Sequence, residues 1–256
     1  MNVVIPMAGR GSRFSIESDK NPEYKKPKPL INIAGVEMIQ WTTSSLNLEP
    51  SDNFIFLILK EHVDEHSIDK RLKEIYGNNV KIIVVDQVTN GPACTVLLAK
   101  EHINNDEPMI ITDCDHLIDG DAMIKDAKKY GTKIDGLIPV FYANNLRFSF
   151  SRTDEEGLVI EVLEKTIISR NANAGVYYFR KGRDFVWAAE EMIDENDRAN
   201  GEFYVAPVYN YLIRRGKKIR LCRPKFFHGI GTPKEVEKFL DFLKRGEIET
   251  KIRFSL

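Results

Sequence analysis

Residues 2–14 have the sequence NVVIPMAGRGSRF, a short apolar run followed by a loop with two glycines and two arginines. The apolar run predicts a β-strand, and the glycines let the following backbone approach an anion closely while the arginines supply positive charge. Phe14 stands where the dinucleotide fingerprint GxGxxG requires its third glycine, and no Gly-Lys-Ser/Thr follows, so neither that fingerprint nor a P-loop fits. The stretch therefore predicts a strand that ends in a phosphate-binding loop, with a plain strand-to-helix turn as the alternative.

Similar apolar runs recur along the first half of the chain and alternate with segments of helical period. The predicted strands are residues 2–6, 54–59, 80–85 and 109–112, and the predicted helices lie near 38–46, 64–76 and 92–102. This alternation is typical of βα units around a largely parallel sheet. We expect an α/β fold with an open, doubly wound, Rossmann-like sheet.

The pattern changes after a helix predicted to run from beyond Asp119 to Tyr130. Residues 134–142, 148–152, 158–163 and 174–179 read as successive strands, and helices are predicted at 184–193, 206–215 and 233–244. No linker, internal repeat or low-complexity tract separates the two parts. We expect one domain over residues 1–256, with a nucleotide-binding half at about 1–130 and an acceptor-binding half at about 131–256.

Composition excludes several classes of protein. The chain has 256 residues, 43% hydrophobic and 29% charged, with a formal net charge of −1, which argues against a nucleic-acid binder that relies on a basic field. Its three cysteines form no CxxC pair, so a disulfide framework or a zinc ribbon is not expected. No apolar run approaches the roughly 20 residues that span a bilayer. We expect a cytoplasmic protein without a membrane partner.

Residues 25–30, KKPKPL, place a lysine between two prolines. Pro27 and Pro29 restrict the backbone around Lys28 and hold its ammonium group in a defined place, a restraint that a solvated surface lysine does not need. With the glycine loop shortly before it, Lys28 is predicted to contact a phosphorylated ligand.

Asp113 and Asp115 follow the apolar run at 109–112. They should project from the carboxyl edge of the sheet, where α/β folds bind ligands. Mg²⁺ is usually held by one or two carboxylates together with substrate phosphates. Alternate residues of an extended strand face the same side, so both aspartates could reach one ion, unless either acts only as a helix cap or an ion-pair partner.

The GxGSRF loop followed by KPKPL resembles the start of the sugar-1-phosphate nucleotidyltransferases, which have a GT-A-like mixed sheet, and particularly the branches found in capsule biosynthesis. Further matching motifs follow in the family's order. They are GPACTVL at 91–97, Glu164-Lys165, NAGVY at 173–177, Glu202-Phe203-Tyr204 and Gly231-Thr232-Pro233.

The resemblance implies a Mg²⁺-dependent enzyme that condenses a nucleoside triphosphate with a phosphorylated small molecule and releases pyrophosphate. It also implies residue roles, with Asp115 as the principal metal ligand and Asp113 as an assisting one. Arg13, Lys28, Asp115 and Lys165 are the predicted catalytic residues, with Arg13 on the departing pyrophosphate and Lys165 on the acceptor phosphate. The predicted nucleotide-binding residues are Ala8, Gly9, Gly11, Ser12, Arg13, Gln87 and Gly91, and the predicted acceptor-binding residues are Glu164, Lys165, Asn173, Gly175 and Tyr204.

One position departs from the family pattern. Members usually carry an aspartate, their second metal ligand, two residues before the Gly-Thr pair, and here Gly229 occupies that position. Asp113 could supply the second carboxylate, His228 or water could fill the gap, or phosphates could hold most of the ion. Imidazole is a poor ligand for Mg²⁺, which makes His228 the weakest of these options.

Other candidate residues carry weaker signals. His62 and His66 lack the glutamate of an HExxH motif and read as a solvated helix face. Gln87 either bonds a base edge or is an ordinary surface glutamine. Trp41 and Trp187 lie in helical patterns and read as core or interface residues.

Two other functions remain open at this point. A metal-dependent glycosyltransferase also uses Asp-x-Asp but has no clear need for the GxGSR and KPKPL motifs. A nucleotide-binding regulatory subunit with a decayed site would account for Gly229. The resemblance favours a pyrimidine triphosphate, with CTP slightly ahead of UTP and dTTP, and a role in capsule or surface polysaccharide synthesis. It leaves the acceptor and any homo-oligomer undetermined.

Overall fold

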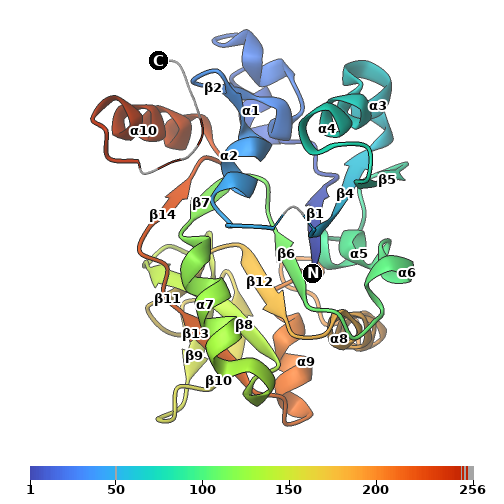
Figure 1. Cartoon of the computed structure of the whole chain (residues 1–256), viewed down its shortest axis with the longest axis vertical. Coiled ribbons are helices and arrows are strands. Elements are labelled where there is room, and N and C mark those ends of the chain that lie inside the picture. Colours follow the sequence, from blue (N-terminus) through green and yellow to red (C-terminus); the bar gives the residue numbers. More distant parts are fainter. Residues whose placement is uncertain (50, 249, 251, 253–256) are drawn as a thin grey trace.

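The computed structural model describes residues 1–256 except 50, 249, 251 and 253–256 (Figure 1). The first part contains β1 (Asn2–Met7), α1 (Ser12–Ser15), η1 (Pro22–Lys25), η2 (Lys28–Leu30), β2 (Asn32–Ile33), β3 (Val36–Glu37), α2 (Met38–Ser44), β4 (Asn53–Leu59), α3 (Lys60–His66), α4 (Ile68–Tyr76), β5 (Lys81–Val85), α5 (Pro92–Leu97), α6 (Lys100–Ile103), β6 (Met109–Thr112), β7 (His116–Ile118) and α7 (Gly120–Tyr130). The second part contains η3 (Gly131–Lys133), β8 (Gly136–Tyr142), β9 (Ser149–Thr153), β10 (Val159–Glu164), β11 (Asn171–Asn173), β12 (Val176–Phe179), α8 (Gly182–Asp194), α9 (Val208–Arg214), β13 (Ile219–Cys222), β14 (Phe227–Gly229) and α10 (Pro233–Lys244).

One mixed sheet of ten strands organises the described residues. Its order is β10-β9-β11-β8-β12-β6-β1-β4-β5, with β13 paired to β8. The four strands β6, β1, β4 and β5 are mutually parallel, whereas β12 joins β6 antiparallel and begins the mixed part of the sheet. The structure confirms the predicted Rossmann-like, doubly wound mixed sheet.

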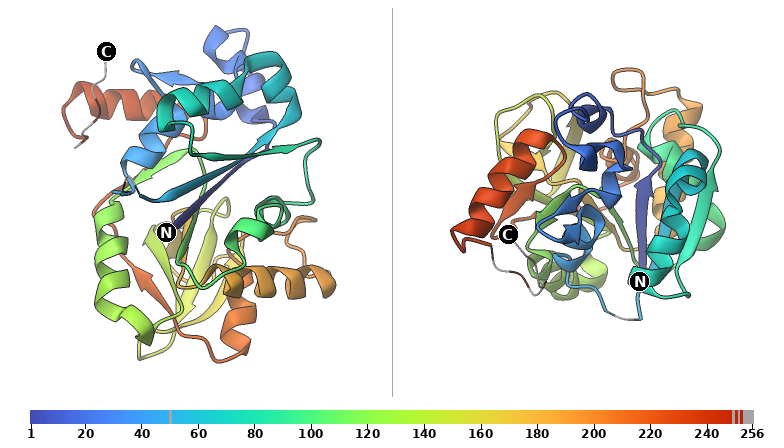
Figure 2. Two further views of the ribbon diagram at one scale, coloured as in Figure 1. Left: turned by 45° about the vertical axis from the view of Figure 1, so that its right-hand side comes forward. Right: turned by 90° about the horizontal axis from the view of Figure 1, so that it is seen from above.

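Helices cover both faces of the parallel strands, as the left view of Figure 2 shows for α4 and α5. Alternate residues of β1 and β4 point to opposite faces, so each strand contributes to two cores. On one face the core joins Val4, Leu57 and Leu59 to Ala93 and Val96 of α5. On the other it joins Val3, Ile5 and Phe56 to Ile68 and Leu72 of α4. Both faces being buried explains why these strands read as continuous apolar runs.

Two predicted helices are each divided in the structure. The helix predicted at 64–76 is broken at Ser67, whose φ of 49° is left-handed and ends α3 before α4 begins. The helix predicted at 92–102 ends at Leu97, and a separate short helix, α6, follows. The interpretation of His62 as part of a solvated helix face is wrong, because its side chain lies on the buried face of α3.

The chain returns to its first part after β13. β14 pairs antiparallel with β7, and α10 then lies beside α1 and α2 (Figure 1). Phe239 of α10 packs edge-on against Trp41 of α2 with 5.1 Å between ring centroids, in a core that also contains Phe14 and Tyr24. Trp41 is fully buried, as predicted for a core residue.

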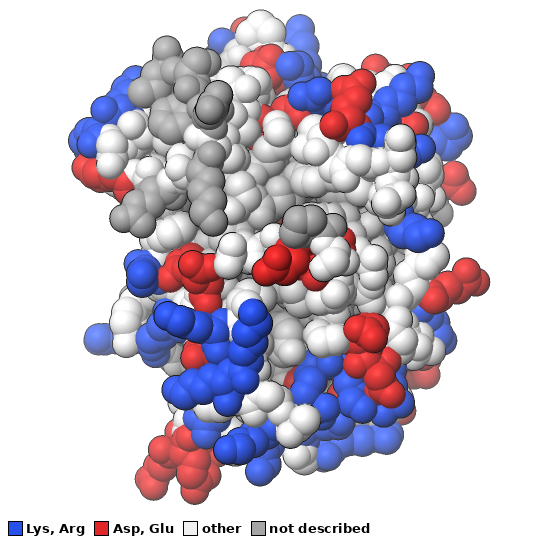
Figure 3. Space-filling view, in the orientation of Figure 1, with Lys and Arg blue, Asp and Glu red and all other residues white. Residues whose placement is uncertain are grey.

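Charged side chains of both signs cover the face drawn in Figure 3, with lysines gathered over α7. The helices of the described residues include none that is long and apolar enough to cross a bilayer.

Candidate functional site

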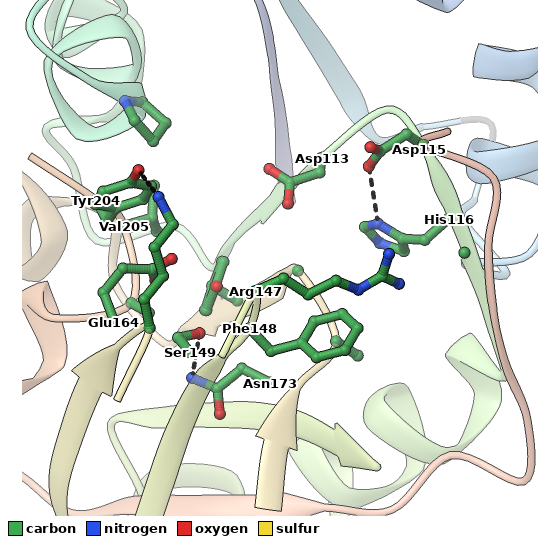
Figure 4. A pocket seen from close by; sticks show the side chains of 18 of the residues that line it. Asp113, Asp115, His116, Arg147, Phe148, Ser149, Glu164, Asn173, Tyr204 and Val205 are labelled. Carbon is green, nitrogen blue, oxygen red and sulfur yellow. Dashed lines mark hydrogen bonds and ion pairs between the residues drawn. The ribbon is translucent and has the colours of Figure 1, made fainter. Parts of the chain in front are cut away.

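A pocket of about 270 Å³ opens where β1 and β6 end (Figure 4). Because these strands are parallel neighbours, their carboxyl ends place the glycine loop and the Asp113-Cys114-Asp115 segment at one edge of the sheet. Residues from the second part of the chain close the other side. The sequence-predicted residues that line this pocket are Arg13, Asp113, Asp115, Glu164, Lys165, Asn173, Gly175 and Tyr204.

The two N-terminal motifs touch each other. Gly11 has a left-handed φ of 63° at the start of α1, and a Cβ there would lie 3.2 Å from Cβ of Lys28. A side chain at position 11 would be strained by this conformation and crowded by Lys28. The glycine loop and the proline-flanked lysine, which the sequence predicted to act together, are therefore neighbours in the fold.

Lys28 connects the N-terminal motifs to the aspartates. Its ammonium group pairs with Oδ2 of Asp115, and the side chains of Lys28 and Asp115 are 22% and 20% exposed. Burial alone would lower the pKa of Lys28, but the Asp115 carboxylate outweighs burial and holds that pKa above its usual value. Burial would conversely raise the pKa of Asp115, but Lys28 holds it well below its usual range. Both groups are charged at neutral pH.

Three potential ligand side chains converge beside this ion pair. Atoms of Asp113, Asp115 and His116 lie within 4.8 Å of one another. The His116 ring lies between Asp115 Oδ1, 3.6 Å from Nδ1, and Thr112 Oγ1, 3.5 Å from Nε2, so it positions Asp115. Two adjacent carboxylates suit a hard cation such as Mg²⁺, and the donor set therefore fits that metal better than it fits a zinc site.

Asp113 differs from Asp115 in its electrostatics. Its side chain faces the pocket, and among the described residues no lysine pairs with it as Lys28 pairs with Asp115. Reduced solvation within the pocket and repulsion from Asp115 raise the pKa of Asp113 to about 6. A cation in the pocket would relieve that repulsion.

Two glycines leave room for these carboxylates. A Cβ at Gly175, where φ is 72°, would lie 2.7 Å from Oδ2 of Asp113. A Cβ at Gly231 would overlap Oδ2 of Asp115. Position 175 therefore requires a glycine, because the backbone there approaches the Asp113 carboxylate closely. The sequence had predicted Gly175 only as an acceptor-binding residue.

The opposite wall is formed by β9, β10 and β11. Lys165 follows β10 with an unfavourable left-handed φ of 52°, and its ammonium group donates to the Tyr204 hydroxyl at 2.5 Å. Burial raises the pKa of the adjacent Glu164 to about 7. The Asn173 amide is fixed by Ser149 Oγ at 2.9 Å and Ser151 Oγ at 2.7 Å.

The other predicted residues, which include Gly11 and Lys28 described above, lie outside the lining of this pocket. Ala8 is buried, Gly9, Ser12 and Gln87 are exposed, and Gly91 is packed so closely that a Cβ would lie 2.5 Å from the backbone of Phe203. His228 lines two other cavities, against Phe239 and Phe242, and does not face the aspartates. A nucleotide-binding role for Ala8, Gly9, Ser12, Gln87 and Gly91 stays a prediction.

Three further side chains that can carry charge line the pocket but were not predicted as site residues. His116 is the histidine beside the aspartates, and Arg147 and Glu235 form an ion pair at the pocket wall. Glu235 is also the residue that lies beside Gly229, where family members usually carry an aspartate. A Cβ at Gly229 would lie 2.8 Å from Oε1 of Glu235. The space beside Gly229 is thus taken by a carboxylate from the first turn of α10.

The site thus combines Arg13, directly after the glycine loop, with an acidic pair that follows β6 and a second wall of antiparallel strands. The chain belongs to the nucleotidyl transferase family, whose model matches residues 7–238. It is therefore an enzyme of the nucleotidyl-transfer type.

Solved structures share this fold over nearly the whole chain. A nucleoside-diphosphate-sugar pyrophosphorylase from Vibrio cholerae RC9 is 25% identical with a TM-score of 0.80, over 93% of this chain and 99% of that one. A structure assigned as a glucose-1-phosphate thymidylyltransferase from Bacillus anthracis is 18% identical with a TM-score of 0.75, over 100% and 98%. The inositol-1-phosphate CTP transferase from T. maritima is 13% identical with a TM-score of 0.73, over 98% of both chains. Among curated proteins, none matches the sequence.

Proposed function

We propose that this enzyme joins a pyrimidine nucleoside triphosphate, CTP ahead of UTP and dTTP, to a phosphorylated small molecule and releases pyrophosphate. The observation that carries the proposal is a single pocket lined by both parts of the chain. Arg13 and Asp115 line it from the first part, and Lys165 and Tyr204 line it from the second. Two phosphorylated ligands that meet there would each find a cationic side chain. A glycosyltransferase would need only one such ligand.

The reaction is in-line attack of an acceptor phosphate oxygen on the α-phosphorus. The acceptor oxygen is already anionic, so no side chain has to remove a proton, and catalysis consists of positioning and charge neutralisation. In this assignment Arg13 offsets charge on the departing pyrophosphate, Lys28 acts on the triphosphate, and Lys165 holds the acceptor phosphate. The boundary between nucleotide and acceptor halves falls near residue 130.

Asp115 is the proposed main ligand of Mg²⁺ and Asp113 the assisting one. When bound, the metal would neutralise phosphate charge and orient the triphosphate. Lys28 pairs with Asp115, so the ammonium group and a bound metal would share one carboxylate. His116 contacts the other oxygen of Asp115 and would help to keep that carboxylate oriented toward the metal.

The choice of base and acceptor rests on resemblance. The capsule-type motifs favour CTP and a role in surface polysaccharide synthesis in the cytoplasm. The similar folds include a thymidylyltransferase and a CTP transferase by their descriptions, which supports pyrimidine triphosphates as a group. The acceptor can be a sugar phosphate or another phosphorylated metabolite, as the pocket holds both fixed amide and carboxylate groups.

A pyrophosphate-release screen tests this function. Purified protein with Mg²⁺ is assayed with CTP, UTP, dTTP, ATP and GTP, each against a panel of phosphorylated metabolites. We expect release that requires both substrates and is highest with a pyrimidine triphosphate. Release of a nucleoside diphosphate from a nucleotide-sugar, or the complete absence of turnover, would instead favour the glycosyltransferase or the regulatory subunit.

Replacing Lys165 with methionine tests the assignment of the two sides. Because Lys165 is placed on the acceptor phosphate, the variant should raise the acceptor KM by about 10-fold or more and leave triphosphate affinity, measured by calorimetry, nearly unchanged. Tyr204→Phe removes the hydroxyl that Lys165 contacts but keeps the ring and the charge of Lys165, so it should raise the acceptor KM less than the methionine variant does. Loss of triphosphate affinity with an unchanged acceptor KM would reverse the assignment.

A further inference from the structure

Arg147 and Glu235 form an ion pair that the proposed reaction does not use. Arg147 lies in the connection between β8 and β9, Glu235 lies in the first turn of α10, and Nη2 of Arg147 donates to Oε1 of Glu235. The side chains are 38% and 19% exposed. Both residues line the site pocket and also a neighbouring cavity of about 460 Å³, so the guanidinium group has open space on two sides.

Contacts of both its side chain and its backbone fix the orientation of Arg147, which suits an arginine that binds a ligand. Its guanidinium lies over the ring of Phe148, 4.4 Å from the centroid, and its backbone N–H donates to Asn145 Oδ1 at 3.1 Å. Figure 4 shows its side chain extending across the pocket toward His116, away from Tyr204. A planar guanidinium is suited to carboxylate and phosphate groups, and here it already binds a carboxylate of its own chain.

Glu235 is anchored independently of Arg147. Its Oε2 accepts from Thr232 Oγ1 at 3.0 Å, while its backbone N–H donates to the same Thr232 oxygen at 3.3 Å. Thr232 thus caps α10 and also holds the Glu235 carboxylate at the start of this helix. Gly229 leaves the space in which the carboxylate lies. Arg147 can therefore leave Glu235 without loss of the cap.

Charge in the pocket favours such an exchange. Asp113, Asp115, Glu164 and Glu235 all line it, so a phosphate that enters this acidic pocket needs more than one cationic partner. Lys165 is bonded to a neutral hydroxyl, whereas the charge of Arg147 is offset by a carboxylate. A phosphate dianion offers Arg147 more charge and more acceptor oxygens than Glu235 does.

We propose that Arg147 binds the acceptor phosphate on the side of the pocket next to His116 and Asp115, and that Glu235 is an internal stand-in which this phosphate displaces. Assignment of the phosphate to the acceptor rests on the proposed function. Arg147 is then a second pocket cation available to the acceptor, besides Lys165. The Glu235 carboxylate lowers acceptor affinity by competing for Arg147.

The two members of the pair should have opposite effects on phosphate binding. Inorganic phosphate is titrated into the intact protein, and binding is followed by calorimetry and by the Arg147 Nε–H resonance. Arg147→Met should raise the Kd by about 10-fold or more. Glu235→Gln, which retains the helix cap, should lower the Kd by roughly 3- to 10-fold. In the Arg147→Met background, Glu235→Gln should have no further effect.

Arg152→Met and Glu237→Gln are the matched controls. Arg152 is an exposed arginine of β9 paired with Glu161 at 2.7 Å, and Glu237 is an exposed glutamate of α10. Neither control should change the Kd.

Three results would overturn the proposal. They are an unchanged Kd in Arg147→Met, weaker binding in both single variants as expected of a purely structural pair, and an equal gain from Glu235→Gln with and without Arg147. If Arg147→Met does not fold, two other measurements test the proposal. Arg147→Lys should also raise the Kd, and the Arg147 Nε–H resonance of the unaltered protein should shift when phosphate is added; an unchanged Kd or resonance would overturn the proposal. The phosphate titration measures binding and needs no turnover. A screen that finds no pyrophosphate release would therefore refute the proposed function without changing the measured phosphate affinities.

Discussion

Replacing Lys28 with methionine keeps most of the side-chain volume and removes the ammonium group that pairs with Asp115. Loss of one partner of a fully buried pair costs about 3–5 kcal/mol. Because both side chains here are about one-fifth exposed, 22% and 20%, water offsets part of that cost and we expect about 2 kcal/mol. For a chain of this size the Tm without metal should fall by about 4–8 °C.

The same substitution should act on metal binding in the opposite direction. Asp115 without Lys28 presents an uncompensated carboxylate beside Asp113, so Mg²⁺ should bind more tightly and should restore much of the lost stability. Turnover should nevertheless fall by on the order of 10²- to 10³-fold, because a preorganised cation is missing from the transition state.

Thermal unfolding and calorimetric Mg²⁺ titration check these expectations together with the pyrophosphate assay. Lys26→Met is the matched control, since Lys26 is 44% exposed and pairs with Glu23 outside the pocket. It should change the Tm, Mg²⁺ affinity and turnover little. A Lys28→Met protein with native turnover, or with weaker Mg²⁺ binding than the unaltered protein, would refute the roles given to Lys28 and Asp115.

Three more substitutions test the pocket. Asp115→Asn should nearly abolish turnover and weaken Mg²⁺ binding, and Asp113→Asn should do so less; a metal titration giving the reverse order would exchange their roles. Glu164→Gln should flatten the pH dependence of stability, because the pKa of about 7 means that ionisation costs the folded protein up to about 3 kcal/mol as pH rises from about 4.5 to about 7. Urea unfolding at pH 5 and pH 8 measures this, and an unchanged slope with pH would contradict it. Gly229→Asp should destabilise the protein by about 1–3 kcal/mol through crowding and repulsion at Glu235, and Glu235→Gln should relieve part of that loss; melting temperatures that do not move would show that Glu235 yields freely.

Much of the fold could be predicted from local sequence. Met109–Thr112 and Pro233–Lys244 have the predicted bounds, because a fully apolar run and a Thr-Pro helix start are strong local signals. The division at Ser67 could not be predicted, since a serine in a left-handed conformation has no sequence signature. The pairing of β7 with β14 joins three-residue strands that tertiary contacts create.

The candidate site divides in the same way. Lys28 and the aspartates could be predicted from proline restraint and from a position at a strand end. Arg147 and Glu235 are 88 residues apart, and each alone reads as an ordinary surface charge. The one local signal was the Thr232-x-x-Glu235 spacing, which predicts a helix cap and says nothing of an arginine partner. Only the fold shows that the cap carboxylate faces a pocket.

The return of α10 to the first part of the chain has a consequence for synthesis on the ribosome. The core that holds Phe14, directly after the glycine loop, and Trp41 is completed by Phe239. At roughly 5–20 residues per second, the nascent chain spends about 10 s or more between the emergence of Phe14 and that of Phe239. Throughout that interval the apolar surface around Phe14 and Trp41 lacks its final cover. The glycine loop is thus translated first but is among the last segments to be packed as in the folded protein. The apolar surface of α1 and α2 is where we expect chaperones to bind the nascent chain.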